Sequence, residues 1–68
     1  MSKALVLGCG ASGIASVRFL KRRGWTVALA DTRESPSSLA EFKQEFPDVP
    51  FTGGSLPLEL LDGCDALV

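Results

Sequence analysis

The sequence predicts an α/β fold in which helices alternate with the strands of an open parallel sheet. Residues 3–7 form an apolar run that ends in a glycine-rich turn, and a helix-like stretch starts at once. A second apolar run, residues 26–30, follows and ends in an acid, Asp31. Such continuous apolar runs are typical of parallel strands covered on both faces. With two later, shorter strands they predict a β-α-β-α-β-α-β chain. Right-handed crossovers then give a Rossmann-like sheet in the order 3-2-1-4.

The turn after the first strand contains the spacing G-x-G-x-x-G in Gly8, Gly10 and Gly13. Gly8 lets the chain turn sharply off the strand, and Gly10 lets the backbone approach a phosphate group. Gly13 lets the helix sit close to the strand. The first turn of the helix then presents N–H groups and the positive end of its dipole to an anion. The alternative is a tight strand-to-helix turn that binds no ligand.

The first helix is expected over residues 12–23. Its apolar side chains spread around much of the helix, which predicts a second covering surface outside this chain. Lys21, Arg22 and Arg23 fall in the last turn, where cations meet the negative end of the dipole. Gly24 suits a left-handed terminator. A phosphate-binding role for the basic residues is less favoured, because they lie at the opposite end of the helix from the glycine turn.

A second helix is expected to end at about Phe46, ahead of a proline. Its start has two candidate signals. Ser35 can be an N-cap followed by Pro36 at the first helical position. Alternatively, Ser38 and Glu41 have the spacing of a capping box. Either start places the apolar residues of this helix on one face, toward the sheet.

Three short stretches complete the predicted fold. Residues 49–52 contain Pro50 and are expected to form an edge strand, because proline cannot donate to a central ladder. Residues 53–55 turn at the ligand side of the sheet, with a role that the sequence leaves open. Residues 58–61 form about one helical turn, and residues 66–68 begin a final strand.

The length of 68 residues suits one small domain. The last residues resemble the start of a buried strand, and the sequence stops inside it. We therefore expect residues 1–68 to be a single N-terminal nucleotide-binding domain, a fragment of a longer multi-domain protein. Such a fragment is expected to be marginally stable, since burial barely offsets the conformational entropy of so short a chain. Its unpaired last strand also offers an edge for self-association.

The charge balance excludes several classes of partner. Seven Lys and Arg residues face eight Asp and Glu residues, for a net charge of −1. The charges are mixed along the chain, so we expect no basic surface for nucleic acid. No apolar run approaches the roughly 18 residues of a membrane span, and the start enters a strand rather than a secretory signal. A cytoplasmic protein is expected.

The two cysteines, Cys9 and Cys64, are expected to stay reduced and structural. Cys9 lies just past the C-terminal end of the first strand, and Cys64 just before the N-terminal end of the last. If these strands are parallel neighbours, the sulfurs lie at opposite ends of the sheet, about 15 Å apart. Two cysteines are also too few for a zinc site.

A candidate nucleotide site lies where the C-terminal ends of the first two strands meet, because ligands of open parallel sheets bind there. Asp31 lies 18 residues beyond Gly13, near the spacing of about 20 at which an acid meets a ribose. Arg33 can lie on a base or hold a phosphate, or it can be an exposed loop arginine. The sequence offers no convincing acid–base set, so no catalytic and no metal-binding residue is assigned. The candidate contacts are Gly10, Ala11, Ser12, Gly13, Asp31, Thr32 and Arg33.

Four stretches carry a family resemblance, namely residues 6–15, 30–33, 52–55 and 60–68. Together they cover nearly the whole chain and resemble the N-terminal domain of the Mur ligases, most closely the branch that adds D-glutamate. The step that begins at Asp31 is the most specific part, since many dehydrogenases share the glycine turn. The resemblance implies that the domain binds the UDP part of a UDP-sugar-peptide substrate.

Carried over by position, the resemblance implies contacts for individual residues. Ala11 and Ser12 would lie at the diphosphate, whereas Asp31, Thr32 and Arg33 would lie at the uracil. Ser12 stands where the family often has threonine, so the hydroxyl is kept. Ala11 stands where leucine is common, so packing against the nucleotide is expected to be looser.

The resemblance also implies a reaction for the parent protein, which is amide formation in peptidoglycan synthesis. ATP phosphorylates the terminal carboxyl of the substrate, and the amine of D-glutamate displaces phosphate. ATP and Mg²⁺ would bind the central and C-terminal domains of the same chain, so these residues alone are expected to be catalytically inert. The main alternative is an NAD(P)-binding domain of an oxidoreductase or regulatory protein. In that case Asp31 takes the ribose 2′-hydroxyl, or Arg33 favours a 2′-phosphate. A domain that binds no ligand is the other alternative.

Overall fold

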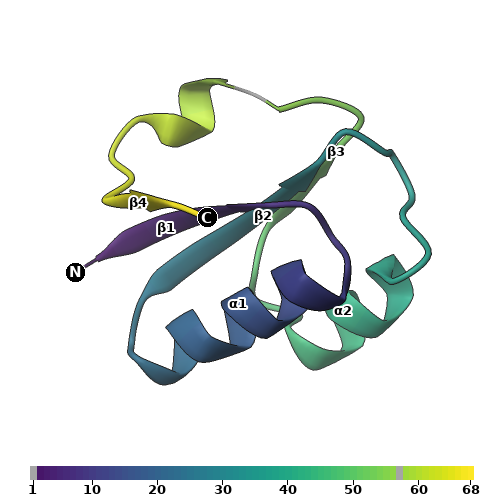
Figure 1. Ribbon diagram of the computed structural model, residues 1–68, viewed down its shortest axis with the longest axis horizontal. Helices are drawn as coiled ribbons and strands as arrows, with labels where there is room; N and C mark the ends of the chain where they lie inside the picture. The colour runs from purple at the N-terminus through teal and green to yellow at the C-terminus, as the bar shows by residue number, and fades with distance from the viewer. Residues whose placement is uncertain (1, 57) are drawn as a thin grey trace.

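Strands and helical segments alternate along the chain, as the sequence predicts (Figure 1). The computed structural model describes residues 2–56 and 58–68. The third helical segment is a single turn of 3₁₀ helix, which agrees with the short turn expected there. The elements in chain order are β1 (Lys3–Leu7), α1 (Ala11–Arg22), β2 (Thr26–Asp31), α2 (Leu39–Glu45), β3 (Phe51–Gly53), η1 (Leu58–Leu61) and β4 (Ala66–Leu67).

The strands form one parallel sheet in the order β3-β2-β1-β4, which confirms the predicted order. β1 lies in the middle, with Leu5 opposite Ala28 of β2 on one side and opposite Leu67 of β4 on the other. Hydrogen bonds extend this last pairing to Val68, whose N–H donates to the Leu5 carbonyl at 2.9 Å. From β1 the chain continues to β2 and β3 on one side of β1, and then crosses to β4 on the other side. The strand order therefore reverses at β1, beside the glycine turn. A crevice at the carboxyl ends is expected at such a reversal.

Both long helices cover the same face of the sheet (Figure 1), and the main core lies between them and the strands. Val17 of α1 and Phe42 of α2 are completely buried there. The Phe42 and Phe46 rings pack with their centroids 5.7 Å apart, which confirms the predicted apolar face of the second helix. The strand side chains that point to this face alternate along β1 and β2, as the two-residue period of a strand requires. They are Ala4, Val6, Val27 and Leu29.

The opposite face of the sheet carries a smaller cluster made of Leu5, Ala28 and Ala30, with Cys64 packed against it. The η1 segment lies on this side of the sheet (Figure 1). Cys9 packs in the main core under the helices. Both cysteines are thiols, and they lie on opposite faces as well as at opposite ends of β1. This separation agrees with the prediction that they stay reduced.

The first helix differs by one residue at each end from the predicted 12–23. α1 begins at Ala11 because Gly10 occupies the N-cap position with extended backbone angles, φ −125° and ψ −169°. It ends at Arg22, and Gly24 follows in the left-handed region with φ +80°. The Gly24 N–H donates to the carbonyl of Lys21 at 3.1 Å, so Gly24 terminates the helix as predicted.

The second helix starts later than one of its two predicted signals, and its cap is different. α2 begins at Leu39 with Ser38 at the N-cap, but the Ser38 side chain makes no capping hydrogen bond. Ser38 has helical backbone angles (φ −87°, ψ 0°), whereas a capping serine is normally extended. The following strand begins at Phe51 instead of residue 49. The Val49 N–H bonds to the Phe46 carbonyl at 3.2 Å, so Val49 belongs to the turn that ends the helix.

Two exposed ion pairs connect α1 to the second helix and to the turn after it. Arg18 holds Glu45 with two hydrogen bonds, from Nε at 2.7 Å and from Nη2 at 2.8 Å. Lys21, for which a role at the helix end was favoured, also pairs with Asp48. Water screens such exposed pairs strongly, so they orient the helices more than they stabilise the fold.

Within the described residues, no helix is long and apolar enough to cross a membrane.

Candidate nucleotide site

The glycine turn connects β1 to α1 in a conformation that fits the role predicted for each glycine. Gly8 has φ +99°, in the left-handed region that favours glycine. A Cβ on Gly13 would lie 1.8 Å from the Gly8 carbonyl oxygen, so α1 packs directly against the turn. A Cβ on Gly10 would meet nothing within 4 Å. Gly10 therefore leaves open space over the backbone where an anion can approach.

The N-terminus of α1 faces this open space with its first N–H groups. The first intrahelical hydrogen bond runs from Ile14 N–H to the Gly10 carbonyl at 2.9 Å. The N–H groups of Ala11, Ser12 and Gly13 precede it and have no acceptor within a regular helix. No acidic residue occupies the first turn, so the positive end of the helix dipole is not offset there. Ala11 and Ser12 are exposed, and this arrangement can bind a phosphate or diphosphate.

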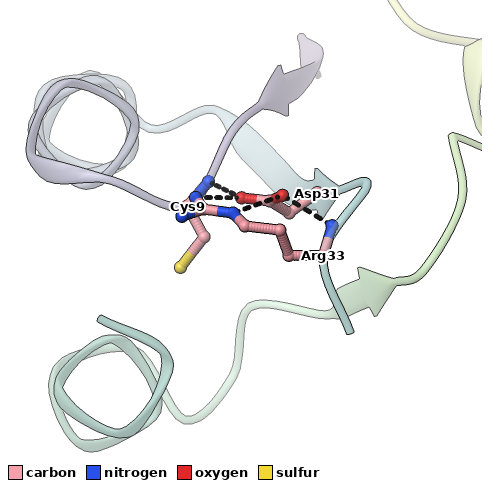
Figure 2. A network of polar contacts seen from close by, with 3 residues as sticks. All are labelled: Cys9, Asp31 and Arg33. Carbon is pink, nitrogen blue, oxygen red and sulfur yellow. Dashed lines mark hydrogen bonds and ion pairs between the residues drawn. The ribbon is translucent and has the colours of Figure 1, made fainter. Parts of the chain in front are cut away.

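Asp31, at the end of β2, is the centre of a polar network that ties β2 to the glycine turn (Figure 2). One carboxylate oxygen, Oδ2, accepts the Cys9 N–H and the Arg33 Nη2, both at 2.7 Å. The other, Oδ1, accepts the Arg33 backbone N–H at 2.9 Å and its Nε at 3.1 Å. An ionised carboxylate offers about four acceptor positions. These four hydrogen bonds therefore occupy the acceptor capacity of Asp31.

The network keeps Asp31 ionised although only 4% of its side chain is exposed. Hydrogen bonds from the Arg33 side chain, then from the backbone N–H groups of Arg33 and Cys9, hold the pKa of Asp31 well below its usual range. The same contact with Asp31 raises the pKa of the Arg33 guanidinium. The pair is therefore a permanent contact between opposite charges at neutral pH.

The thiol of Cys9 lies on the core side of the same turn and is 1% exposed. Burial raises the pKa of the Cys9 thiol, and the negative charge of Asp31 adds to this effect. A buried thiol with a raised pKa is a poor nucleophile. Cys9 therefore serves packing through its side chain and the Asp31 network through its backbone.

Thr32 and Arg33 lie on the solvent side of this end of the sheet. Thr32 is exposed, and the Arg33 side chain is 59% exposed even though it holds Asp31. Figure 2 shows the guanidinium of Arg33 turned back toward the glycine turn. The structure thus brings the two predicted groups, residues 10–13 and residues 31–33, to the same end of the sheet. It links them through the hydrogen bond between the Cys9 N–H and Asp31.

Gly53, the last residue of β3, and Gly54 after it shape the same end of the sheet, a role that the sequence left open. The Gly54 N–H donates to the Asp31 carbonyl at 3.0 Å. A Cβ on Gly53 would lie 2.7 Å from the Glu34 carbonyl oxygen and 3.0 Å from that of Arg33. Gly53 therefore allows the loop that carries Arg33 to lie against β3. The paired glycines after a predicted edge strand were the available signal for this close approach.

Two hollows lie beside α1 and not over the glycine turn. One of about 390 Å³ is lined by Phe19, Leu20 and Val68 together with small residues of α1. The other, of about 280 Å³, runs between α1 and α2 and starts at Ala11. Arg18 and two glutamates of α2 line it, which gives it a mixed charge. The described residues also contain no cluster of metal-ligating side chains.

The fold and the site together define a class of protein. The sheet is parallel in the order 3-2-1-4, a glycine turn leads to an uncapped helix N-terminus, and an acid ends the second strand. These features make a Rossmann-like α/β domain, and they are typical of the Rossmann-like domains that bind nucleotides. A family model described as the N-terminal domain of MurD-like Mur ligases matches residues 2–68. The chain belongs to this family.

Several curated relatives carry the name of one ligase of this family. The UDP-N-acetylmuramoylalanine--D-glutamate ligase of Polaromonas sp. (strain JS666 / ATCC BAA-500) is 48% identical over 59 residues, which is 87% of this chain. The protein of the same name from Pseudomonas fluorescens (strain Pf0-1) is 44% identical over 63 residues, or 93% of this chain. The one from Burkholderia cenocepacia (strain HI2424) is 48% identical over 59 residues. The chain spans only 10% to 14% of the length of these relatives.

Proposed function

We propose that this chain is the N-terminal, UDP-binding domain of a UDP-N-acetylmuramoylalanine--D-glutamate ligase. The observation that carries the proposal is the open helix N-terminus at Gly10, beside the Asp31 network, in a chain of the MurD-like family. The relatives are named as ligases that join D-glutamate to a UDP-linked substrate. The parent protein would act in peptidoglycan synthesis in the cytoplasm.

The diphosphate of the substrate would bind at the start of α1. The N–H groups of Ala11, Ser12 and Gly13 and the helix dipole favour negative charge there. The exposed Ser12 hydroxyl adds a donor that can turn toward a phosphate oxygen. Gly10 supports this assignment because a Cβ built there would meet nothing within 4 Å, so the space beside the turn is open.

The uracil would lie over residues 31–33. Thr32 offers an exposed hydroxyl, and the planar guanidinium of Arg33 can contact the base without leaving Asp31. Asp31 would act by holding this segment in place, since protein donors already occupy its carboxylate. This division of roles assigns the direct base contacts to Thr32 and Arg33.

The chemistry of the reaction would take place outside these residues. In the proposed parent enzyme, ATP with Mg²⁺ activates the carboxyl of the substrate, and the amine of D-glutamate forms the amide. This chain would contribute binding and orientation of the nucleotide end, because it carries no residue that we assign to the chemical step. The remaining domains of the parent protein and the UDP-sugar-peptide substrate are its proposed partners.

A heteronuclear NMR titration of the chain with UDP tests the proposal, with NAD and NADP as parallel controls. Amide shifts at residues 10–13 and 31–33 with UDP alone are the expected result. Shifts at the same residues with NAD or NADP but not with UDP would instead support a dinucleotide domain. Unchanged spectra with all three ligands would contradict nucleotide binding by this chain.

A further inference from the structure

Arg33 supplies three of the four hydrogen bonds that reach the Asp31 carboxylate. Its backbone N–H and its Nε donate to Oδ1, at 2.9 and 3.1 Å, and its Nη2 donates to Oδ2 at 2.7 Å. The guanidinium therefore covers both oxygens, with one side-chain bond to each. The Cys9 N–H, on the turn side, completes the set at 2.7 Å.

Asp31 occupies the position at which dinucleotide-binding Rossmann-like domains have a carboxylate that is free to accept a hydrogen bond from the ligand. In dinucleotide-binding domains an acid at the end of the second strand, about 20 residues beyond the glycine turn, accepts the ribose 2′-hydroxyl. Asp31 has this place in the fold and nearly this spacing, 18 residues after Gly13. Its backbone partners alone would leave one acceptor position on each oxygen, and the Arg33 side chain fills both.

We propose that Arg33 is a specificity-determining residue that closes this site to adenine dinucleotides by occupying the carboxylate of Asp31. A ribose hydroxyl could reach Asp31 only by displacing the guanidinium, which would leave a buried carboxylate without its counter-ion. This inference deepens the proposed function. It rests on the proposed function only for the claim that UDP is the preferred ligand. The exclusion of dinucleotides follows from the geometry of Asp31 and Arg33.

Arg33→Met is the variant that tests the proposal. It removes both side-chain hydrogen bonds and keeps the backbone N–H and the length of the side chain. Because the Arg33 side chain is 59% exposed, the change leaves the core intact. Asp31 then has a vacant acceptor on each oxygen and a charge without its partner. NAD is expected to bind this variant at least tenfold more tightly than it binds the unsubstituted protein. NADP is expected to gain little affinity, because the carboxylate repels its 2′-phosphate.

The measurement is calorimetric titration of the complete protein that carries this domain. A non-hydrolysable ATP analogue is kept at saturation, so that NAD cannot report on an ATP site. The double variant Asp31→Asn/Arg33→Met should lose the gain in NAD affinity, because an amide nitrogen replaces one acceptor and the charge is gone. Arg22→Met, which removes an exposed arginine at the far end of α1, should leave NAD binding as in the parent.

The outcomes separate this inference from the proposed function. Equal NAD affinity in the unsubstituted protein and in Arg33→Met would overturn the proposal. Tight binding of NAD or NADP by the unsubstituted protein would also overturn it. A gain that persists in the double variant would also overturn it, since the carboxylate would not be the acceptor. Failure of the parent to bind UDP would contradict the proposed function, yet the NAD comparison would still decide the role of Arg33. If Arg33→Met does not fold, Arg33→Lys, which cannot make the two-pronged contact, should show a smaller gain.

Discussion

Gly13 is the position where one added carbon should disrupt the glycine turn most severely. In Gly13→Ala the new Cβ would lie 1.8 Å from the Gly8 carbonyl oxygen and 3.0 Å from its carbon. The first contact must lengthen by about 1.2 Å to reach the 3.0 Å that real Cβ atoms respect. Backbone atoms cannot rotate away as a side chain can, so α1 must shift relative to β1. Overpacking of this kind costs about 1–3 kcal/mol or more.

Gly10→Ala is the matched control, because its Cβ would meet nothing within 4 Å and its backbone is extended. We expect its free energy of unfolding to stay within about 0.5 kcal/mol of the parent. Its UDP affinity should nevertheless fall, because the methyl group covers the approach to the phosphate site. Urea unfolding followed by the fluorescence of Trp25, the single tryptophan, gives the stabilities, and NMR titration gives the affinities. Equal stabilities for Gly13→Ala and the parent, or UDP binding unchanged by Gly10→Ala, would refute this reasoning.

Three further substitutions and one labelling reaction test the rest of the fold. The pKa of Asp31 is lowered in the folded state, first by the Arg33 side chain, so its contribution to stability is present above its ordinary value of 3.8 and is lost as pH falls below it. Asp31→Asn should therefore flatten the loss of stability between about pH 5 and pH 2 in acid unfolding. Phe42→Ala, at a completely buried ring, should lower the free energy of unfolding by about 3–5 kcal/mol. Phe19→Ala, at a ring that is 56% exposed, should lower it by less than about 1 kcal/mol in the same urea assay. A maleimide should modify the half-buried Cys64 before the buried Cys9, as mass mapping of the labelled peptides would show; faster labelling of Cys9 would contradict its burial.

Much of the fold could be predicted because its signals are local. The apolar run of β1, the glycines that follow it and the run of β2 fix a β-α-β unit within residues 3–31. The handedness of crossovers then leaves few strand orders to choose from. The positive φ of Gly24 was also predictable, because a helix needs a left-handed residue to end as α1 does.

The features that the sequence did not predict depend on contacts between distant segments or on the choice of a rotamer. The close approach of Gly53 to Glu34 exists only after β3 has paired with β2. The Ser38 side chain had the right spacing for a capping box, but its helical backbone angles leave the cap unmade.

The sequence predicted that residues 10–13 and 31–33 lie near each other, but it did not predict how their side chains are bonded. The glycine turn and the Asp31 segment do meet at one end of the sheet, as the strand order requires. The sequence could not show whether Asp31 is vacant for a ligand or engaged by Arg33, because an arginine two residues away can equally point into solvent. The four hydrogen bonds to Asp31 show that Arg33 engages it, and they are the reason for the positioning role that we propose for Asp31.

A crystal structure of the complete protein with UDP bound would test the central claim most directly. The account predicts the diphosphate at the N–H groups of Ala11 and Ser12, and the uracil against Thr32 and Arg33. It also predicts that the hydrogen bonds between Arg33 and Asp31 remain in place. A nucleotide bound elsewhere on the protein, or a ribose hydroxyl bonded to Asp31 in place of Arg33, would contradict it.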